Sequence, residues 1–366
     1  MEFFISCPFW LQSILKKEIQ FMWYKTTEVT YKWVYFTGDE TAIARVNINS
    51  RVGSKLFLIL GKWKVQTFED LFQLVWRVDW KKWLPTRHPI KTTAFSKKSI
   101  LESTPSIQAI AKKSIVKSIL WGDGMLTEDE GLEILEVRIG IEENYARILL
   151  NTTGDGLHRR WYRVDAWEAP IKENLAAWLV LRSNWKFSTP IYDIFCGSGT
   201  ILIEAAMIAK NIAPWLNRTF AFENFFWIDS QVLDNEMDRA KSKVFTWREH
   251  KLIGSDIDSE MIKIAKENAK AAGVWEYIRF AYRDFVDYKN EEMEWTLLIN
   301  PPYGERLDVN PQVYEDIAEI FKKNEGLNGG LITSFEEFEY MITNKWWKKK
   351  KIYNWSQECS FYQKIK

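Results

Sequence analysis

The segment LINPPYGERL (residues 298–307) contains residue types that could hold the amine of a nucleobase. The Asn300 side-chain oxygen and the Pro301 carbonyl oxygen can accept two N–H bonds, which would orient the amine and raise the electron density on its nitrogen. Pro301 and Pro302 restrict φ, so these acceptors are held in place before a ligand binds. Tyr303 offers a ring on which the base can stack. We therefore predict that Asn300, Pro301, Pro302 and Tyr303 are catalytic residues that position an amine for attack on a methyl group.

A glycine-rich loop and two acidic strand ends precede this segment. The loop DIFCGSGT (residues 193–200) would bring backbone close to a ligand at a helix N-terminus. It is followed by no Gly-Lys-Ser/Thr, which excludes a triphosphate loop, and Leu202 stands at the third glycine position of dinucleotide-binding enzymes. Asp256 follows the strand KLIG and can accept bonds from both ribose hydroxyls. Asp284 follows YIRFAYR and can accept a bond from an adenine amino group.

Ligands of open α/β sheets bind beyond the carboxyl ends of the strands, so these segments should lie together. Together they predict S-adenosyl-L-methionine as the cofactor. Each segment alone also has a purely structural interpretation, because NPPYG can be a turn and a carboxylate can cap a helix, as we expect for Asp258. The predicted cofactor contacts are Asp193, Cys196, Gly197, Ser198, Gly199, Asp256, Ile257 and Asp284.

The composition describes a soluble globular chain of 366 residues, with 46% hydrophobic and 27% charged residues, which is enough for two or three domains. No apolar stretch reaches membrane-spanning length and the first residues lack a secretory signal, so we expect a cytoplasmic protein. The three cysteines and three histidines are scattered, so we expect neither a metal site nor a disulfide framework. Nothing in the sequence indicates a protein partner.

Positive charge is concentrated in residues 77–120, which hold ten basic and two acidic side chains. This segment therefore carries +8, and the rest of the chain carries −7, since the total is +1. Such local basicity is typical of a contact with a polyanion, although a solvated lysine face fits the charge equally well. Lys112, Lys113 and Lys117 fall on one side of the helix predicted after Thr104.

The order of predicted elements divides the chain into three parts. Residues 1–50 and 51–155 each read as a small α+β unit. Residues 156–366 alternate strand and helix, which predicts an α/β Rossmann-like domain with a mixed, mostly parallel sheet.

Tryptophan is unusually frequent, with 20 residues against 17 glycines. Trp33, Trp161 and Trp215 stand where a turn would favour glycine, because indole cannot supply a cheap positive φ. One hypothesis is that some of these codons are UGA, read as glycine in the source organism. The alternative is a chain that is rich in tryptophan.

Taken together, these motifs resemble a known family, the THUMP-domain class I methyltransferases that form N2-methylguanosine in RNA, and in particular the bacterial branch that acts on large-subunit ribosomal RNA. The stretches that carry the resemblance are LHRRWYR, APIKENLAA, DIFCGSGTILIEAAMIA, NIAPWLNRTFAFE, GSDID and NPPYGERL. The sequence departs from the family where Ile194 replaces a usual proline, and where Trp161 and Trp215 replace glycines.

The resemblance implies a role for each part of the chain. The glycine loop would hold the methionine part of the cofactor, Asp256 its ribose and Asp284 its adenine, and residues 300–303 the target guanine. Residues 1–50 would be a ferredoxin-like segment and residues 51–155 a THUMP domain that binds RNA. The RNA contacts implied are Lys112, Lys113, Lys117, Arg159, Arg160 and Arg163.

Several alternatives stay open at this point. Ribosomal RNA is the expected substrate, but transfer RNA fits the same motifs. NPPY also occurs in enzymes that methylate adenine N6 in nucleic acids. A silent RNA-binding assembly factor would keep the fold without its chemistry, and an oxidoreductase is disfavoured by the glycine pattern.

Overall fold

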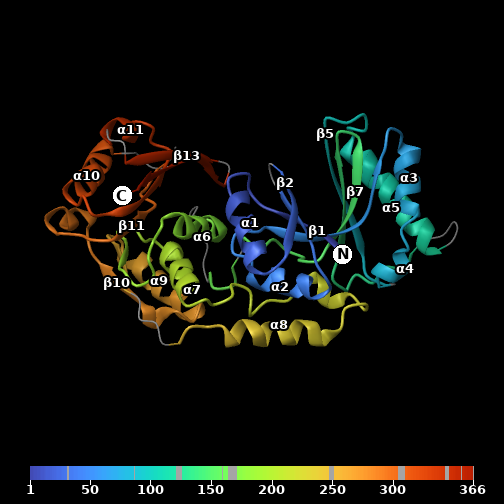
Figure 1. The fold of residues 1–366 in the computed structure, drawn as a ribbon, viewed down its shortest axis with the longest axis horizontal. Helices are drawn as coiled ribbons and strands as arrows, with labels where there is room; N and C mark the ends of the chain where they lie inside the picture. Colours follow the sequence, from blue (N-terminus) through green and yellow to red (C-terminus); the bar gives the residue numbers. More distant parts are fainter. Residues whose placement is uncertain are drawn as a thin grey trace. The chain divides into compact units, whose positions relative to one another are not determined.

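The computed structural model describes residues 1–30, 33–85, 87–120, 126–158, 160–163, 171–246, 251–303, 310–342, 346–355 and 357–365. The chain forms two compact units (Figure 1). The first comprises Met1–Leu157 and Leu216–Arg239, and the second comprises His158–Trp215 and Ala240–Lys366. Within the described residues, no helix combines the length and the apolar character that crossing a bilayer requires.

The first unit is built on one seven-stranded sheet with the order β2-β3-β1-β4-β7-β6-β5. The first four of these strands, with two helices, follow a βαββαβ path, and the strands of residues 51–155 extend the same sheet. The elements are β1 (Glu2–Ser6), α1 (Gln12–Phe21), β2 (Lys25–Val29), β3 (Trp33–Thr37), α2 (Thr41–Asn49), β4 (Lys55–Lys64), α3 (Phe68–Trp76), α4 (Trp80–Trp83), β5 (Ile90–Lys97), α5 (Thr104–Leu120), β6 (Leu135–Glu142), β7 (Tyr145–Asn151), η1 (Ala221–Asn224) and α8 (Ser230–Ser242).

This sheet curls strongly. Trp33 in β3 and Phe95 in β5 have ring centroids only 5.2 Å apart, although four other strands separate β3 from β5 in the sheet. The curl encloses a buried cluster formed by Phe4, Tyr35, Phe57 and Leu149. Gly140 permits this closure, because a Cβ there would lie 2.5 Å from the Phe95 ring.

Residues 216–239, which the sequence assigns to the third domain, pack on the first unit. Arg45 in α2 forms an ion pair with Glu236 in α8 (2.6 Å), and Phe222 N donates to Thr152 O (3.0 Å). The segment is therefore an excursion of the chain between two parts of the second unit.

The second unit is a seven-stranded sheet with the order β10-β9-β8-β11-β12-β14-β13. The first five strands are parallel, and β14 and β13 are antiparallel to their neighbours, as predicted for a mixed, mostly parallel sheet. The elements are α6 (Glu173–Arg182), β8 (Ile191–Asp193), α7 (Thr200–Ala209), β9 (Leu252–Asp256), α9 (Ser259–Ala271), η2 (Trp275–Tyr277), β10 (Ile278–Tyr282), η3 (Phe285–Asn290), β11 (Thr296–Ile299), α10 (Pro311–Lys323), β12 (Asn328–Thr333), α11 (Phe338–Met341), β13 (Trp347–Asn354) and β14 (Gln357–Lys364).

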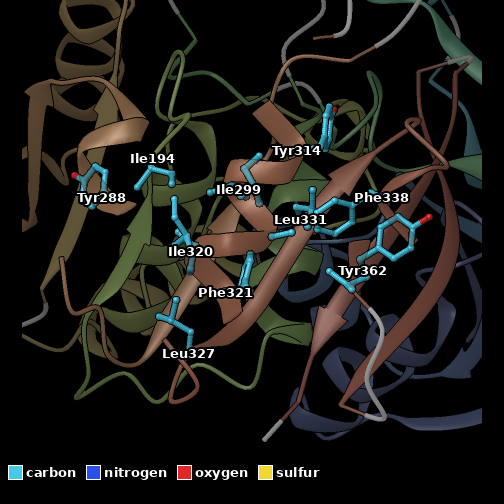
Figure 2. Close-up of a cluster of buried hydrophobic side chains, with 14 of the residues drawn as sticks. Ile194, Tyr288, Ile299, Tyr314, Ile320, Phe321, Leu327, Leu331, Phe338 and Tyr362 are labelled. Carbon is cyan, nitrogen blue, oxygen red and sulfur yellow. The ribbon is translucent and has the colours of Figure 1, made fainter. Parts of the chain in front are cut away.

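The central strands of this sheet are covered on both faces. Figure 2 shows one of them, where Ile299 and Leu331 of the sheet meet Tyr314, Ile320 and Phe321 of α10. On the other face, Trp178 of α6 packs edge-on against Phe361 of β14 (5.5 Å). A sheet covered on both sides needs strands that are apolar throughout, and this explains the run TLLI of β11.

Within the described ranges, three tryptophans adopt left-handed backbone conformations: Trp23 (φ 71°), Trp295 (φ 90°) and Trp355 (φ 56°). Trp23 follows α1 in a Schellman arrangement, with Tyr24 N bonded to Ile19 O (3.2 Å), where glycine is the usual residue. Trp355 directly follows the last residue of β13 and is the first loop residue before β14, a position where a two-residue hairpin turn favours glycine. The positions named from sequence differ: Trp33 lies in the extended strand β3, and Trp161 and Trp215 are not among the described residues with positive φ. Trp33 and Trp215 also pack against other side chains. The backbone thus supports the hypothesis of UGA codons read as glycine, but at Trp23, Trp295 and Trp355.

We expect Trp23→Gly and Trp355→Gly each to raise the free energy of unfolding by about 1 kcal/mol, because a left-handed conformation costs a non-glycine residue about 1–2 kcal/mol. Urea unfolding measures this directly. Trp215→Gly is the contrasting variant: removing this buried indole should lower the free energy of unfolding. Loss of stability in the first two variants would contradict the argument, and UGG codons at 23, 295 and 355 would end the recoding hypothesis.

Candidate active site

The predicted site residues lie at the carboxyl edge of the second unit's parallel strands. Strand β8 is central: the chain moves outward from it through β9 to β10 and returns to β11 on its other side. This reversal makes the β8–β11 pair the topological switch point of the sheet, where α/β proteins bind ligands. Asp193 ends β8, Asp256 ends β9, and Asn300 follows β11, so these chain segments meet at one edge.

Hydrogen bonds from strand β9 and helix α9 hold the glycine loop that follows β8. Cys196 N donates to Ser255 O (3.0 Å), and Gly197 N donates to Asp256 Oδ2 (2.9 Å). Asn268 of α9 donates its amide to Ser198 O (3.0 Å). The loop is therefore fixed by a neighbouring strand and by a helix that follows it in sequence.

The two loop glycines serve different needs. Gly199 has φ +81°, and a Cβ there would lie 3.1 Å from both Ala265 and Phe280. Gly197 has φ +48°, yet a Cβ there would meet no atom of the described structure within 4 Å. Gly199 is thus required by packing, whereas the space beside Gly197 is open to a ligand.

Asp256 and Asp193 are close enough to interact but differ in environment. Asp256 accepts bonds from Gly197 N and from Asp258 N (3.0 Å), one on each oxygen, which leaves acceptor capacity on both. Asp193 is 1% exposed and accepts one bond, from Phe195 N (3.3 Å). Burial and, to a lesser extent, the Asp256 carboxylate raise the pKa of Asp193 well above its ordinary value. A buried carboxyl of this kind suits a cationic ligand group.

The remaining predicted cofactor contacts have mixed surroundings. Asp284 is half-buried and caps η3 by accepting a bond from Val286 N (3.0 Å), which uses one of its acceptor sites. Ile257 is exposed beside Asp256. Cys196 is buried, and burial raises the pKa of its thiol, so the side chain is an inert packing group. Asp258 caps α9 through Glu260 N (2.8 Å), as expected from the sequence.

The segment after β11 presents one unsatisfied acceptor. Asn300 Oδ1 is buried and has no hydrogen-bond partner among the described residues. The Pro302 carbonyl accepts a bond from the Tyr314 hydroxyl of α10 (2.9 Å), so the protein engages this carbonyl. The Tyr303 hydroxyl accepts a bond from Asn354 Nδ2 (3.0 Å). Residues 304–309, which complete the NPPYGERL motif, lie outside the described residues.

The structure corrects part of the predicted RNA-binding set. The Arg160 side chain is fully buried and pairs with Glu204 in α7 (3.1 Å), so it cannot contact RNA as it stands. Arg163 is mostly buried and donates to Ile171 O (3.0 Å) and to Thr200 Oγ1 (3.3 Å), beside the glycine loop. The burial of Arg160 therefore speaks against its predicted RNA contact, whereas the contact predicted for Arg163 stays a prediction. A run of arginines predicts a basic surface when its acidic partners are distant in sequence.

The lysines of α5 are placed differently. Lys113 is exposed, and Lys117 is partly buried. Lys112 is partly buried, binds the Ile90 carbonyl (2.7 Å) and is paired with Glu128. Arg159 lies outside the described residues. Lys113 therefore remains the most accessible member of the predicted set within the described structure.

Three supporting residues were missed by the sequence analysis: Asn268 under the loop, Tyr314 at Pro302, and Asn354 at Tyr303. Each is a polar residue in an element packed against the site. In the described part of the chain, no three His, Cys, Asp or Glu side chains are grouped so as to hold a metal ion.

Family models match two segments of the chain. The model described as "RMKL-like, methyltransferase domain" matches residues 160–363, and the model described as "RlmL ferredoxin-like domain" matches residues 2–57. The second match confirms the predicted ferredoxin-like segment at the N-terminus.

Two curated relatives are informative. "Putative RNA methyltransferase YpsC" of Bacillus subtilis is 35% identical over 364 residues, which cover 98% of this chain and 94% of the relative. "Ribosomal RNA large subunit methyltransferase K/L" of Shewanella oneidensis is 31% identical over 372 residues. That match covers 99% of this chain but 52% of the relative, so the chain spans about half the length of the K/L proteins.

Two solved structures share the whole fold. SMU.472, described as "a putative methyltransferase complexed with SAH", is 33% identical with a TM-score of 0.90, covering 100% of this chain and 97% of that one. A "predicted N6-adenine-specific DNA methylase" from Listeria monocytogenes is 35% identical with a TM-score of 0.91, covering 99% and 95%. These comparisons confirm the predicted α/β methyltransferase fold with S-adenosyl-L-methionine as its cofactor, and the chain belongs to the RMKL-like methyltransferase family.

Proposed function

We propose that this protein transfers the methyl group of S-adenosyl-L-methionine to the exocyclic N2 atom of a guanine in RNA. The first candidate substrate is 23S ribosomal RNA and the second is transfer RNA. The single observation that carries the proposal is the buried Asn300 Oδ1, which has no partner among the described residues and follows the strand beside the glycine loop at the switch point. The names of the YpsC and K/L relatives support RNA as the substrate. Such a substrate places the reaction in the cytoplasm.

The residues present fit the cofactor. The open space beside Gly197 accommodates its methionine part, and Asp193 offers a buried carboxyl to the ammonium group. Asp256 retains acceptor sites for the ribose hydroxyls, and Asp284 lies at the next strand end for the adenine. The cofactor supplies an electrophilic methyl group on a positively charged sulfur.

The chain's own task is to prepare the amine. Asn300 Oδ1 and the Pro301 carbonyl oxygen each accept a hydrogen bond from one N–H of the amine. These two bonds direct the nitrogen lone pair along the line of attack. The nitrogen forms a bond to the methyl carbon as the carbon–sulfur bond breaks, and the electron pair of that bond stays on sulfur. The methylated nitrogen then loses its proton to solvent. No strong base is needed, because the methylated nitrogen is acidic.

Tyr303 acts through its ring in this mechanism. Burial raises the pKa of its hydroxyl above the ordinary value, so the side chain is neutral at physiological pH and does not serve as a base. The Tyr314 hydroxyl, whose pKa burial raises to about 12, stays protonated and fixes the Pro302 carbonyl. The two tyrosines thus hold the segment, and we assign the Asn300 and Pro301 oxygens to the amine.

Adenine-N6 methylation is the second candidate, since the Listeria relative carries that description and an adenine amine could use the same two acceptors.

Helical RNA conceals the guanine edge, so the target base must be in a loop or be flipped out, which costs a few kcal/mol. Phosphate contacts from the basic segment 77–120, which includes the exposed Lys113, would offset this cost and make binding sensitive to salt.

We expect Asn300→Ala to lower kcat for RNA methylation by about 100- to 1,000-fold, the range for removing one preorganised acceptor or donor at a reacting group. Tritium transfer from labelled cofactor into ribosomal and transfer RNA measures the rate. Nucleoside digestion and mass spectrometry identify the product. Calorimetry should show unchanged cofactor affinity in the variant. Methyladenosine as the sole product would reject the guanine assignment, and full activity of the variant would reject the role of Asn300.

We expect Gly197→Ala to weaken cofactor binding by about tenfold or more, because the new methyl group would project into space assigned to the ligand. Gly273→Ala is a matched control: Gly273 also has a positive φ (+68°) and an open Cβ position, but it lies just beyond α9. Both variants should lose similar stability, about 1 kcal/mol. Equal cofactor affinity in the two variants would show that the loop does not contact the ligand.

We expect cofactor binding to release a proton from Asp193. At pH values below the raised pKa this carboxyl is protonated in the free protein, whereas an ammonium partner favours its ionised form. Affinity should therefore rise with pH from about 4 up to the raised pKa, and flatten above it. Calorimetry in buffers of different ionisation enthalpy counts the protons. Asp193→Asn should bind more weakly and without this pH dependence, and a flat profile in the unmodified protein would refute the assignment.

A further inference from the structure

Asn354 is a buried amide that the proposed mechanism leaves unused. It is the last residue of β13 and lies opposite Gln357 in the β13–β14 pairing. Asn354 is 5% exposed, and its Nδ2 donates to the Tyr303 hydroxyl (3.0 Å). Its Oδ1 is buried and has no hydrogen-bond partner in the described part of the chain. A buried acceptor without a donor is costly, so an orphaned oxygen beside Tyr303 points to a donor on a ligand.

The amide group of Asn354 is held in one orientation. The Tyr303 hydroxyl interacts with the Cys359 thiol of β14 as well as with Asn354. Burial raises the pKa of that thiol, so it stays neutral. Both strands of the hairpin therefore fix the hydroxyl, and Nδ2 is committed to it. Since Oδ1 shares a planar group with Nδ2, its position is fixed as well.

We propose that Asn354 is a specificity-determining residue whose Oδ1 accepts the N1–H of the target base. The inference rests on the proposed function and adds a third acceptor to Asn300 Oδ1 and the Pro301 carbonyl. Guanine carries hydrogens on N2 and on the adjacent N1, so its edge offers donors to all three oxygens. Adenine carries a lone pair on the N1 beside its amine, and Asn354 Oδ1 would face that lone pair. The arrangement therefore selects guanine over adenine.

The base analogue 2-aminopurine tests this assignment, because it keeps the 2-amino group and lacks the N1 hydrogen. The target guanine is first mapped by nucleoside analysis, and a short RNA is then made with guanine or 2-aminopurine at that position. The unmodified protein should prefer guanine by at least about tenfold in kcat/KM. Asn354→Ala should bring this preference close to one while leaving cofactor affinity unchanged.

Two further variants distinguish the two roles of Asn354, which are recognition of the base through Oδ1 and positioning of Tyr303 through Nδ2. Asn354→Asp keeps an acceptor oxygen but cannot donate to Tyr303, so it should preserve the preference for guanine at a lower rate. Gln357→Ala disturbs the same end of the hairpin, where the Gln357 amide binds Ser334 (3.2 Å), and should leave the preference unchanged. The proposal is overturned if Asn354→Ala slows both RNAs equally or neither, or if Asn354→Asp loses the preference. An unmodified protein that transfers no methyl group to guanine would instead refute the proposed function.

Discussion

The hydrogen bond from Gly197 N to Asp256 Oδ2 joins the cofactor loop to the neighbouring strand, and the rest of the site depends on it. The donor is a backbone group after β8, and the acceptor is the last side chain of β9. Because each strand end constrains the other, the carboxylate proposed to bind ribose is placed by the loop proposed to bind methionine. A ligand that contacts both therefore meets a preorganised surface, which lowers the entropic cost of binding.

A buried ionic network supports the same loop from the other side. Glu204 is an acidic residue within the apolar helix α7, and it binds Arg160 (3.1 Å) and the Tyr162 hydroxyl (3.1 Å). Arg163 extends the network to Thr200 at the start of α7. Removing one member of a buried pair leaves an uncompensated charge, which typically costs about 3–5 kcal/mol. The arginines predicted as RNA contacts thus hold the chain segment before α6 against the helix that carries the cofactor loop.

The sequence was sufficient for the positions of Asp193, Asp256 and Asn300, because a parallel α/β topology places every carboxyl strand end on one edge. It was insufficient for side chains whose partners are distant. Asn268 binds a carbonyl 70 residues away, and Asn354 binds a hydroxyl 51 residues away. Neither contact leaves a local pattern. One signal was present but unused: a single glutamate in the apolar run TILIEAAMIA requires a cationic or donor partner, and Arg160 supplies it.

The tryptophans show how backbone geometry and side-chain packing answer different questions. At Trp23 and Trp355 the backbone is left-handed, so glycine would relieve strain. Trp23 is 89% exposed and glycine would remove little packing there, whereas at Trp355 it would also remove a contact with Lys172 (4.6 Å). At Trp215 the side chain is 1% exposed and lies under the Arg160 guanidinium (4.6 Å), so glycine would open a cavity beside the buried ion pair. A departure from the family's glycine is therefore an argument for recoding only where the backbone itself requires glycine. At Trp215 the indole instead shields a charge on which the cofactor loop depends.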